Sequence, residues 1–243
     1  MFELIGQTEH FIVVNKSAGI GFHNDEQQAG LFTTVSQFAK DQLAIKELYP
    51  VHRLDKMTSG LILFATSLKA ANQFQQLFSQ HQVEKYYLAL SDKKPKKKQG
   101  LIKGDMAKSR RGMWKLLRSQ TKPAITQFFS YSLANQTMAT EAKDQRLFIL
   151  KPHSGKTHQI RVALTSIGAP ISGDQLYYPN ATAADIGNQE RGYLHAYALR
   201  FKLFDQDYQY LLPPSQGTLF NDSGLASLLK ELAEPWLLNW PKI

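Results

Sequence analysis

The segment VHRLDKMTSGLILFAT, residues 51–66, places charged side chains directly before an uninterrupted apolar stretch. Residues 61–65 (LILFA) have the length and composition of a buried strand. His52, Arg53 and Asp55 precede this strand within four positions. A loop that leads into a buried strand can hold a carboxylate at the floor of a cleft, so Asp55 is the first candidate for a catalytic residue.

Two structural interpretations compete with catalysis by Asp55. Arg53 and Asp55 can form a local ion pair, and residues 58–60 (TSG) can be only a turn. A carboxylate that is partly removed from water favours its neutral form unless a cation keeps it charged. Arg161 is a candidate for that cation, because it lies on the flank of the apolar face of a predicted helix.

The composition of the 243-residue chain, 43% hydrophobic and 20% charged, is typical of a globular protein with a sizeable core. The absence of cysteine excludes disulfides, zinc–thiolate sites, iron–sulfur clusters and cysteine nucleophiles. The N-terminal sequence lacks the charged and apolar regions of a signal peptide, and no apolar stretch is long enough to span a bilayer. We therefore expect a cytoplasmic protein without membrane contact.

The net charge of +9 is concentrated in one stretch, residues 93–122, which carries twelve Lys or Arg and a single acid. Such a stretch is either a solvated insertion or a surface that binds phosphates. Trp114, which lies among several basic residues, favours nucleic acid. We expect RNA contacts from five basic side chains, which are Lys96, Lys97, Lys98, Arg110 and Arg111.

Apolar periodicity predicts strands and helices that are mixed along the chain without strict alternation, which indicates an α+β fold. The expected strands are 11–15, 61–65, 83–90, 124–133, 146–152, 193–203 and 208–212. The expected helices are 31–48, 69–80, 157–168 and 223–233. Ser67 and Thr157 are the predicted N-caps of the second and third helices.

Motifs for several common chemistries fail at specific positions. The segment His153–His158 (HSGKTH) contains a GKT, but Leu150 stands where a phosphate-binding P-loop needs a glycine. Gly19 and Gly21 lack the third glycine of a dinucleotide site, and the two histidines lack the spacing and acids of a zinc protease. No serine lies in a G-x-S-x-G sequence. Chemistry without a metal or cofactor is compatible with these failures.

Five separated motifs resemble those of the RluA family of RNA pseudouridine synthases in order and spacing. They are HRLDKMTSGLILF (52–64), FIVVNKSAGIGFH (11–23), VEKYYLAL (83–90), GKTHQIRVALTSIGAPISGDQLY (155–177) and LHAYALRF (194–201). The chain departs from the usual family pattern at Ser17, Lys156 and Ala163, where proline, arginine and histidine are common. Because the motifs begin close to Met1, we expect the short form without an N-terminal S4-type RNA-binding domain.

The resemblance implies the pseudouridine synthase catalytic fold, a mixed and largely antiparallel sheet flanked by helices, with a central active-site cleft. We expect one catalytic domain over residues 1–243, with the basic stretch at about 93–122 as an insert. The expected partner is ribosomal or transfer RNA. The resemblance implies no protein partner, and we expect a monomer.

The resemblance also implies the reaction, in which uracil is detached from C1′, turned and rejoined through C5 without a cofactor or metal. Asp55 would be the catalytic carboxylate, which either attacks C1′ or removes the 2′ proton. Tyr87 would lie against the uracil and help to remove the C5 proton, and Arg161 would pair with Asp55. Flipping the uridine out of a helix costs roughly a few kcal/mol. Arg53 would enter the vacated stack, and His52 is expected to contact RNA beside it.

Two other functional classes account for part of the sequence. A non-catalytic RNA-binding protein explains the basic stretch but leaves Asp55, Tyr87 and Arg161 without a role. A glycoside hydrolase needs a second acid opposite Asp55. Asp174 is available, although its SGD setting predicts a turn that supports the site.

Overall fold

The structure is a computed structural model that describes residues 1–26, 28–133, 145–178 and 190–243. The chain divides into two compact units. The first unit comprises Met1–Glu84 and His195–Pro214, and the second comprises Lys85–Leu194 and Ser215–Ile243. The single catalytic domain expected over residues 1–243 stays a prediction.

The first unit is built on a mixed sheet in which β1, β2, β4 and β11 are neighbours in that order. β3 also pairs with β4, and β12 pairs with β11. Every pairing in this unit is antiparallel except the parallel contact of β4 with β11. The elements are β1 (Phe2–Gln7), β2 (Phe11–Lys16), α1 (Leu31–Gln42), β3 (Tyr49–Pro50), β4 (Ser59–Ala65), α2 (Leu68–Ser79), β11 (Leu194–Leu203) and β12 (Gln206–Leu211).

β4 is the central strand of the first unit, and all seven of its residues are buried. Leu61 and Leu63 lie in one core cluster with Phe74 of α2. The ring of Phe64 stacks instead with those of Phe22 and Phe32. Because both faces of β4 are covered, its sequence is apolar at every position rather than at alternate ones.

The second unit contains an antiparallel sheet with the order β5, β10, β9, β6, and a separate hairpin of β7 and β8. The elements are β5 (Glu84–Ser91), β6 (Gln99–Gly104), β7 (Met106–Lys108), the 3₁₀ turn Arg110–Gly112, β8 (Trp114–Leu116), β9 (Ala124–Ser132), β10 (Arg146–Pro152), α3 (Gln159–Ser166), the 3₁₀ turns Thr218–Asn221 and Pro235–Leu237, and α5 (Ser223–Glu231). With both units described, the α+β class and the mixed, largely antiparallel pairing are confirmed.

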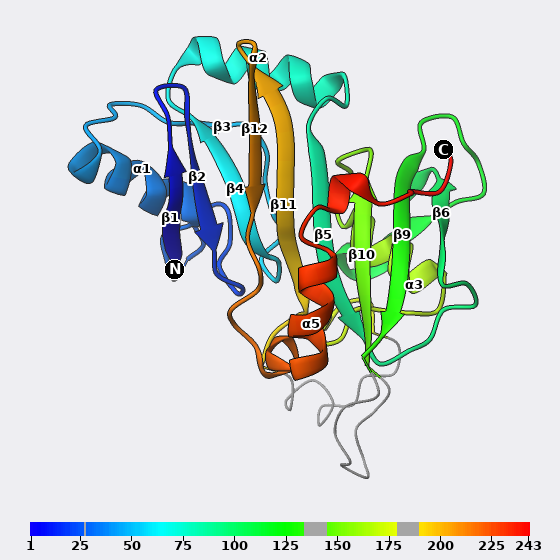
Figure 1. Ribbon diagram of the computed structural model, residues 1–243. Coiled ribbons are helices and arrows are strands. Elements are labelled where there is room, and N and C mark those ends of the chain that lie inside the picture. The colour runs from blue at the N-terminus through cyan, green and yellow to red at the C-terminus, as the bar shows by residue number, and fades with distance from the viewer. Residues whose placement is uncertain (27, 134–144, 179–189) are drawn as a thin grey trace. The chain divides into compact units, whose positions relative to one another are not determined.

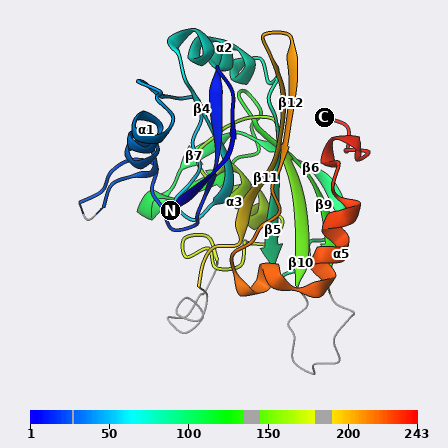
Figure 2. The ribbon, with the colours of Figure 1, turned by 60° about the vertical axis from the view of Figure 1, so that its left-hand side comes forward.

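Helices cover opposite faces of the sheet of the second unit. Figure 1 shows α5 and the C-terminal segment in front of β5, β10 and β9, and α3 behind them. The turned view in Figure 2 separates α5 and α3 on the two sides of the same strands. Contacts agree with this arrangement. Gln159 at the start of α3 donates a hydrogen bond to Thr126 of β9, whereas Trp240 of the C-terminal segment packs on Phe129 of the same strand. Thr126 and Phe129 are three positions apart, so their side chains point to opposite faces of the sheet.

The structure agrees with the predicted helix ends at one position and differs from them at two others. The helix predicted over 31–48 ends at Gln42, because Ala44 takes a left-handed conformation with φ of 55°. Ser67 caps α2 as predicted, since its Oγ accepts a hydrogen bond from the Ala70 N–H at 3.2 Å. The cap predicted at Thr157 is wrong: α3 starts after His158, which is left-handed with φ of 58° and makes no side-chain cap bond.

The basic stretch, residues 93–122, contributes regular structure to the second unit. It provides β6, which pairs with β9, and the whole β7–β8 hairpin. All twelve of its Lys and Arg residues are exposed. Among the residues that the structure describes, no helix is long and apolar enough to cross a membrane.

Candidate active site

The loop that carries Asp55 joins β3 to β4 and is tied to the turn after β2. Lys16 is completely buried, and its Nζ donates hydrogen bonds to the carbonyl oxygens of Ser17 and Ile20 at 2.9 Å and of Lys56 at 3.3 Å. The Gly19 N–H donates to the same Lys56 oxygen at 2.8 Å. These bonds fix the backbone beside Asp55, whose own side chain is half-buried.

His52 anchors the same loop to β4. Its Nε2 accepts a hydrogen bond from the Leu63 N–H at 3.0 Å, and its ring lies 5.3 Å from that of Phe78. Arg53 is exposed. The two residues before β4 therefore differ in placement. His52 contacts β4 and α2, and the side chain of Arg53 is exposed to solvent. The RNA contacts expected of both stay predictions.

Ser59 and Gly60 are the first residues of β4, so the interpretation of residues 58–60 as only a turn is wrong. Ser59 Oγ lies 2.7 Å from Nδ1 of buried His195, whose Nε2 lies 2.8 Å from the Leu212 carbonyl oxygen. Gly60 has φ of 105° and faces the backbone of Ala196 on β11. A glycine is required here, because a Cβ would lie 2.3 Å from the Ala196 oxygen.

Replacing Gly60 by Ala is expected to lower the free energy of unfolding by about 3 kcal/mol or more, since strain at positive φ adds to a clash with backbone. Urea denaturation measures this loss. Gly112→Ala is the matched control, because Gly112 also has positive φ but no atom lies within 4 Å of the position that its Cβ would occupy, and we expect a loss of about 1 kcal/mol. Equal losses for the two variants would contradict the role assigned to the β4–β11 contact.

Tyr87 lies on the face of the second unit's sheet that α3 covers. It is opposite Leu150 on β10, which is in turn opposite Phe128 on β9. Phe128 shares a face with Thr126, the residue that bonds to α3. The neighbouring Tyr86 points to the other face, where it is fully buried with ring centroids 6.4 Å from Trp236 and 5.8 Å from Trp240.

Lys85 shares the face of Tyr87, two positions earlier in β5. Burial lowers the pKa of its ammonium group to about 8. An ammonium group with a pKa near 8 is still mostly protonated at neutral pH. Lys85 was not singled out from the sequence, although its spacing from Tyr87 within one strand was visible.

Arg161, on α3, is held by Asp174 rather than standing alone. Its Nε donates to Oδ2 of Asp174 and its Nη2 to Oδ1, both at 2.7 Å, and both side chains are buried. Oδ1 of Asp174 also accepts the N–H groups of Leu176 and Tyr177, at 3.0 and 3.1 Å. Asp174 therefore organises a turn, as predicted, and the structure adds that this turn holds Arg161. A carboxylate bound in this way is unsuited to the second acid of a hydrolase.

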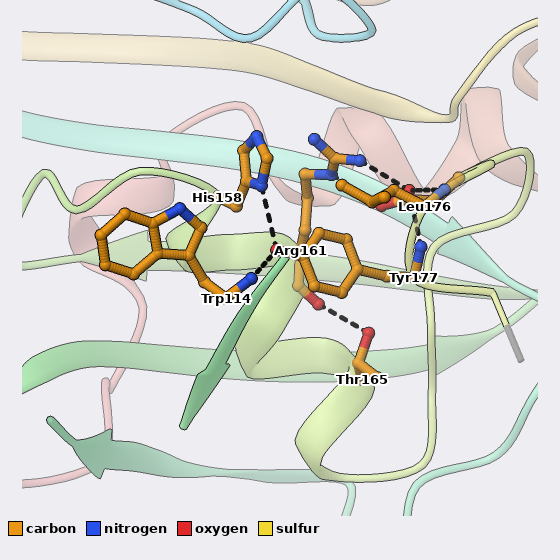
Figure 3. A network of polar contacts seen from close by, with 7 residues as sticks. Trp114, His158, Arg161, Thr165, Leu176 and Tyr177 are labelled. Atoms are coloured by element: carbon orange, nitrogen blue, oxygen red, sulfur yellow. Dashed lines mark hydrogen bonds and ion pairs between the residues drawn. The ribbon is translucent and has the colours of Figure 1, made fainter. Parts of the chain in front are cut away.

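Tyr177 joins Arg161 to the β7–β8 hairpin. The Arg161 Cζ lies 4.8 Å from the centre of the Tyr177 ring. The Tyr177 hydroxyl accepts a hydrogen bond from the backbone N–H of Trp114 at 2.7 Å and lies 2.9 Å from Nδ1 of His158 (Figure 3). This network was not predicted from the sequence, because its members come from three separate parts of the chain.

The candidate catalytic residues come from both units. Asp55 belongs to the first, and Tyr87 and Arg161 belong to the second. Within the second unit, Tyr87 and α3 lie on one face of the sheet. The pairing of Arg161 with Asp55 stays a prediction. Among the described residues, no three His, Asp or Glu side chains are grouped in a way that could hold a metal ion.

Comparison with known proteins identifies the family. The model of the RNA pseudouridylate synthase family matches residues 10–166. An uncharacterized RNA pseudouridine synthase of Haemophilus influenzae is 46% identical, and the match covers 88% of each chain. The tRNA pseudouridine synthase C of Yersinia pestis is 28% identical over 97% of this chain and 88% of its own. The dual-specificity RNA pseudouridine synthase RluA of Pasteurella multocida is 29% identical over 82% and 86%.

The fold is also that of a solved relative. The human RNA pseudouridylate synthase domain containing 1 superposes with a TM-score of 0.73 at 21% identity, over 96% of this chain and 95% of that one. The match to the family model includes the Asp55 loop, β5 and α3. The chain therefore belongs to the RNA pseudouridylate synthase family, as an RluA-type RNA pseudouridine synthase and thus an isomerase.

Proposed function

We propose that this enzyme converts a specific uridine of transfer or ribosomal RNA to pseudouridine, with Asp55 as the catalytic carboxylate. The observation that carries the proposal is the Asp55 loop, which is clamped by buried Lys16 inside the segment that matches the family. The loop holds a half-buried carboxylate, which suits an active-site group. The relative named as a tRNA pseudouridine synthase supports transfer RNA as the substrate class.

The proposed reaction is an isomerisation. Asp55 acts on the ribose, either by attacking C1′ or by removing the 2′ proton, and the bond from C1′ to N1 of uracil breaks. The uracil turns and C5 bonds to C1′, after which the C5 proton is lost and N1 gains a proton. Tyr87 lies against the uracil and assists the loss of the C5 proton, and Arg161 pairs with Asp55. No atoms are gained or lost overall, so these steps balance without a further reactant.

Nucleoside chromatography of unmodified transfer and ribosomal RNA treated with the protein tests this proposal. We expect pseudouridine at one or a few positions, without release of a base. Free uracil would identify a hydrolase, and bound but unchanged RNA would identify a non-catalytic RNA-binding protein. Pseudouridine mapping in cells with and without the gene would locate the modified position. We place the enzyme in the cytoplasm, with its RNA substrates, and expect it to act as a monomer.

Tyr87 can be tested by two replacements that separate its ring from its hydroxyl. Tyr87→Phe keeps the ring that stacks on uracil but removes the hydroxyl, so we expect kcat to fall on the order of a hundredfold with little change in KM. Tyr87→Ala removes both groups and should also raise KM. Steady-state assays measure the two constants. Full activity of Tyr87→Ala would contradict the assignment, and buried Tyr86 offers no replacement, since it points to the other face.

The exposed basic stretch is proposed to contact phosphates of the substrate. Each phosphate contact that is lost should lower the slope of log affinity against log salt concentration by about 0.7 to 0.9. Filter binding at several salt concentrations measures that slope for single Lys→Gln or Arg→Gln variants. The residues to change are Lys96, Lys97, Lys98, Arg110 and Arg111. Lys202→Gln, at an exposed position of β11, is the control. Slopes equal to that of the control variant would contradict phosphate contacts and indicate that the basic stretch is only a solvated surface.

A further inference from the structure

A pocket of about 480 Å³ lies beside the β7–β8 hairpin in the second unit. Its volume falls within the range of about 300 to 1,000 Å³ that is usual for small-molecule sites. The hairpin contributes Met106 and Trp114, Asp105 lies between β6 and β7, and the loops after β8 and β10 contribute the remaining walls. The complete lining is Asp105, Met106, Trp114, Thr121, Lys122, Gly155, Lys156 and Thr157.

The lining combines the groups that recognise a nucleotide. Trp114 is the aromatic residue of the lining, and its side chain is half-buried. Lys122 and Lys156 supply two positive charges against the single negative charge of Asp105. Single-stranded nucleic acid is held by stacking of bases on aromatic side chains together with cations near the backbone. A phosphate alone would leave the indole unused, and an apolar ligand would leave both ammonium groups unused.

Asp105 stabilises the wall of the pocket, and its negative charge is outweighed by the two lysines of the lining. Its carboxylate accepts the N–H groups of Thr121 at 3.0 Å and Lys122 at 2.8 Å. Hydrogen bonds from the Ser119 side chain and from Thr121 keep the pKa of Asp105 below its usual value. The ionised carboxylate therefore holds the loop that positions Lys122, and the two lysines leave the lining with a net positive charge.

The pocket is attached to Arg161 through one residue. The backbone N–H of Trp114 bonds to the Tyr177 hydroxyl, and the Tyr177 ring packs against Arg161 (Figure 3). Trp114, the residue that would stack a base, is thus held by Tyr177, which also packs against Arg161 of the proposed active site. Because the bond uses the backbone of Trp114, replacing its side chain leaves this connection intact.

We propose that this pocket binds one nucleotide of the substrate RNA other than the target uridine, with its base stacked on Trp114 and its phosphate at Lys122 and Lys156. The inference rests on the proposed function for the identity of the RNA. It adds a subsite that selects and positions the substrate, and it assigns Trp114 as a residue that contacts RNA.

Steady-state kinetics on the RNA modified by the parent enzyme test the subsite. Trp114→Ala should raise KM roughly tenfold, the order expected for one lost base stack, while kcat changes little. Trp114→Phe retains an aromatic face and should recover most of that loss. Lys156→Gln should lower the salt slope by about 0.7, and Lys230→Gln, an exposed position on α5, should not. A parent-like KM for Trp114→Ala would overturn the proposal while leaving the synthase function intact.

A readout that does not need catalysis separates the two proposals. The protein can be labelled with 5-fluorotryptophan, which gives ¹⁹F signals for its three tryptophans, and Trp114→Phe assigns the signal of Trp114. Adenosine 5′-monophosphate should shift the Trp114 signal and leave those of Trp236 and Trp240 in place. Inorganic phosphate should shift none of them. The proposal is overturned if adenosine 5′-monophosphate leaves Trp114 unmoved or if phosphate moves it equally. If the Trp114 signal shifts but the protein makes no pseudouridine, the subsite is supported and only the proposed function is refuted.

Discussion

Asp55→Asn is expected to abolish pseudouridine formation, with a fall in rate on the order of a thousandfold or more. The replacement keeps the size of the side chain but removes the charge that either nucleophilic attack on C1′ or removal of the 2′ proton requires. The loop should keep its position, because the bonds from Lys16 and Gly19 end on the backbone of Lys56 and not on the carboxylate. RNA binding should persist or strengthen, since a negative charge near phosphates is lost. Nucleoside chromatography and filter binding measure the two effects.

The control for Asp55→Asn is Asp41→Asn, which makes the same change of charge on the exposed surface of α1. Circular dichroism and urea denaturation should show both variants as stable as the parent, and Asp41→Asn should retain its activity. Pseudouridine formation by folded Asp55→Asn at the parent's rate would overturn the assignment of the catalytic carboxylate. The family membership of the chain would stand in that case, because it rests on the whole matched segment.

Replacement of Arg161 by Met should affect activity and stability together. Arg161 is proposed to pair with Asp55, so activity should fall on the order of a hundredfold. The change also leaves buried Asp174 without its bidentate partner, which typically costs about 3–5 kcal/mol. Nucleoside chromatography and urea denaturation measure the two effects.

A paired replacement separates the two roles of Arg161. In Arg161→Met/Asp174→Asn the buried charges disappear together, and the Asn oxygen can still accept the N–H groups of Leu176 and Tyr177. Stability should therefore recover much of the loss, as it does when both members of a buried pair are removed. Activity should stay low. If activity returns with stability, or if folded Arg161→Met keeps the parent's rate, Arg161 serves only to hold the turn.

Local sequence patterns were sufficient for elements whose signals lie within a few residues. Ser67 accepts a hydrogen bond from Ala70, three positions later, so the cap of α2 could be predicted from the chain alone. The continuous apolar sequence of residues 61–65 likewise predicts that both faces of β4 are buried. The same reasoning failed at α3, where the left-handed His158 takes the N-cap position and Gln159 bonds to Thr126 on a strand far away in sequence.

The strands of the basic stretch show why composition can hide structure. Lysine and arginine are usual in solvated segments, and every Lys and Arg of residues 93–122 is exposed. Yet β6 pairs with β9, and β7 pairs with β8, because backbone groups form the ladder irrespective of the charge on outward side chains. The prediction of an insert stays a prediction. Only the pairing partners show that β6 belongs to the sheet of the second unit and that β7 and β8 form a separate hairpin.

The sequence by itself determined the family, the α+β class and the candidates Asp55, Tyr87 and Arg161, because motif order and local periodicity are properties of the chain. The tertiary structure decided which groups support them. Asp174 was visible as part of a turn, but its two bonds to Arg161 depend on how that turn meets α3. The sequence does not distinguish Gly60 from the other fourteen glycines, whereas the structure shows that the backbone of Ala196 leaves no room for a Cβ there. Hydrogen bonds and steric contacts act over a few ångströms in space, whatever the separation along the chain, so such pairs can be read only from the folded protein.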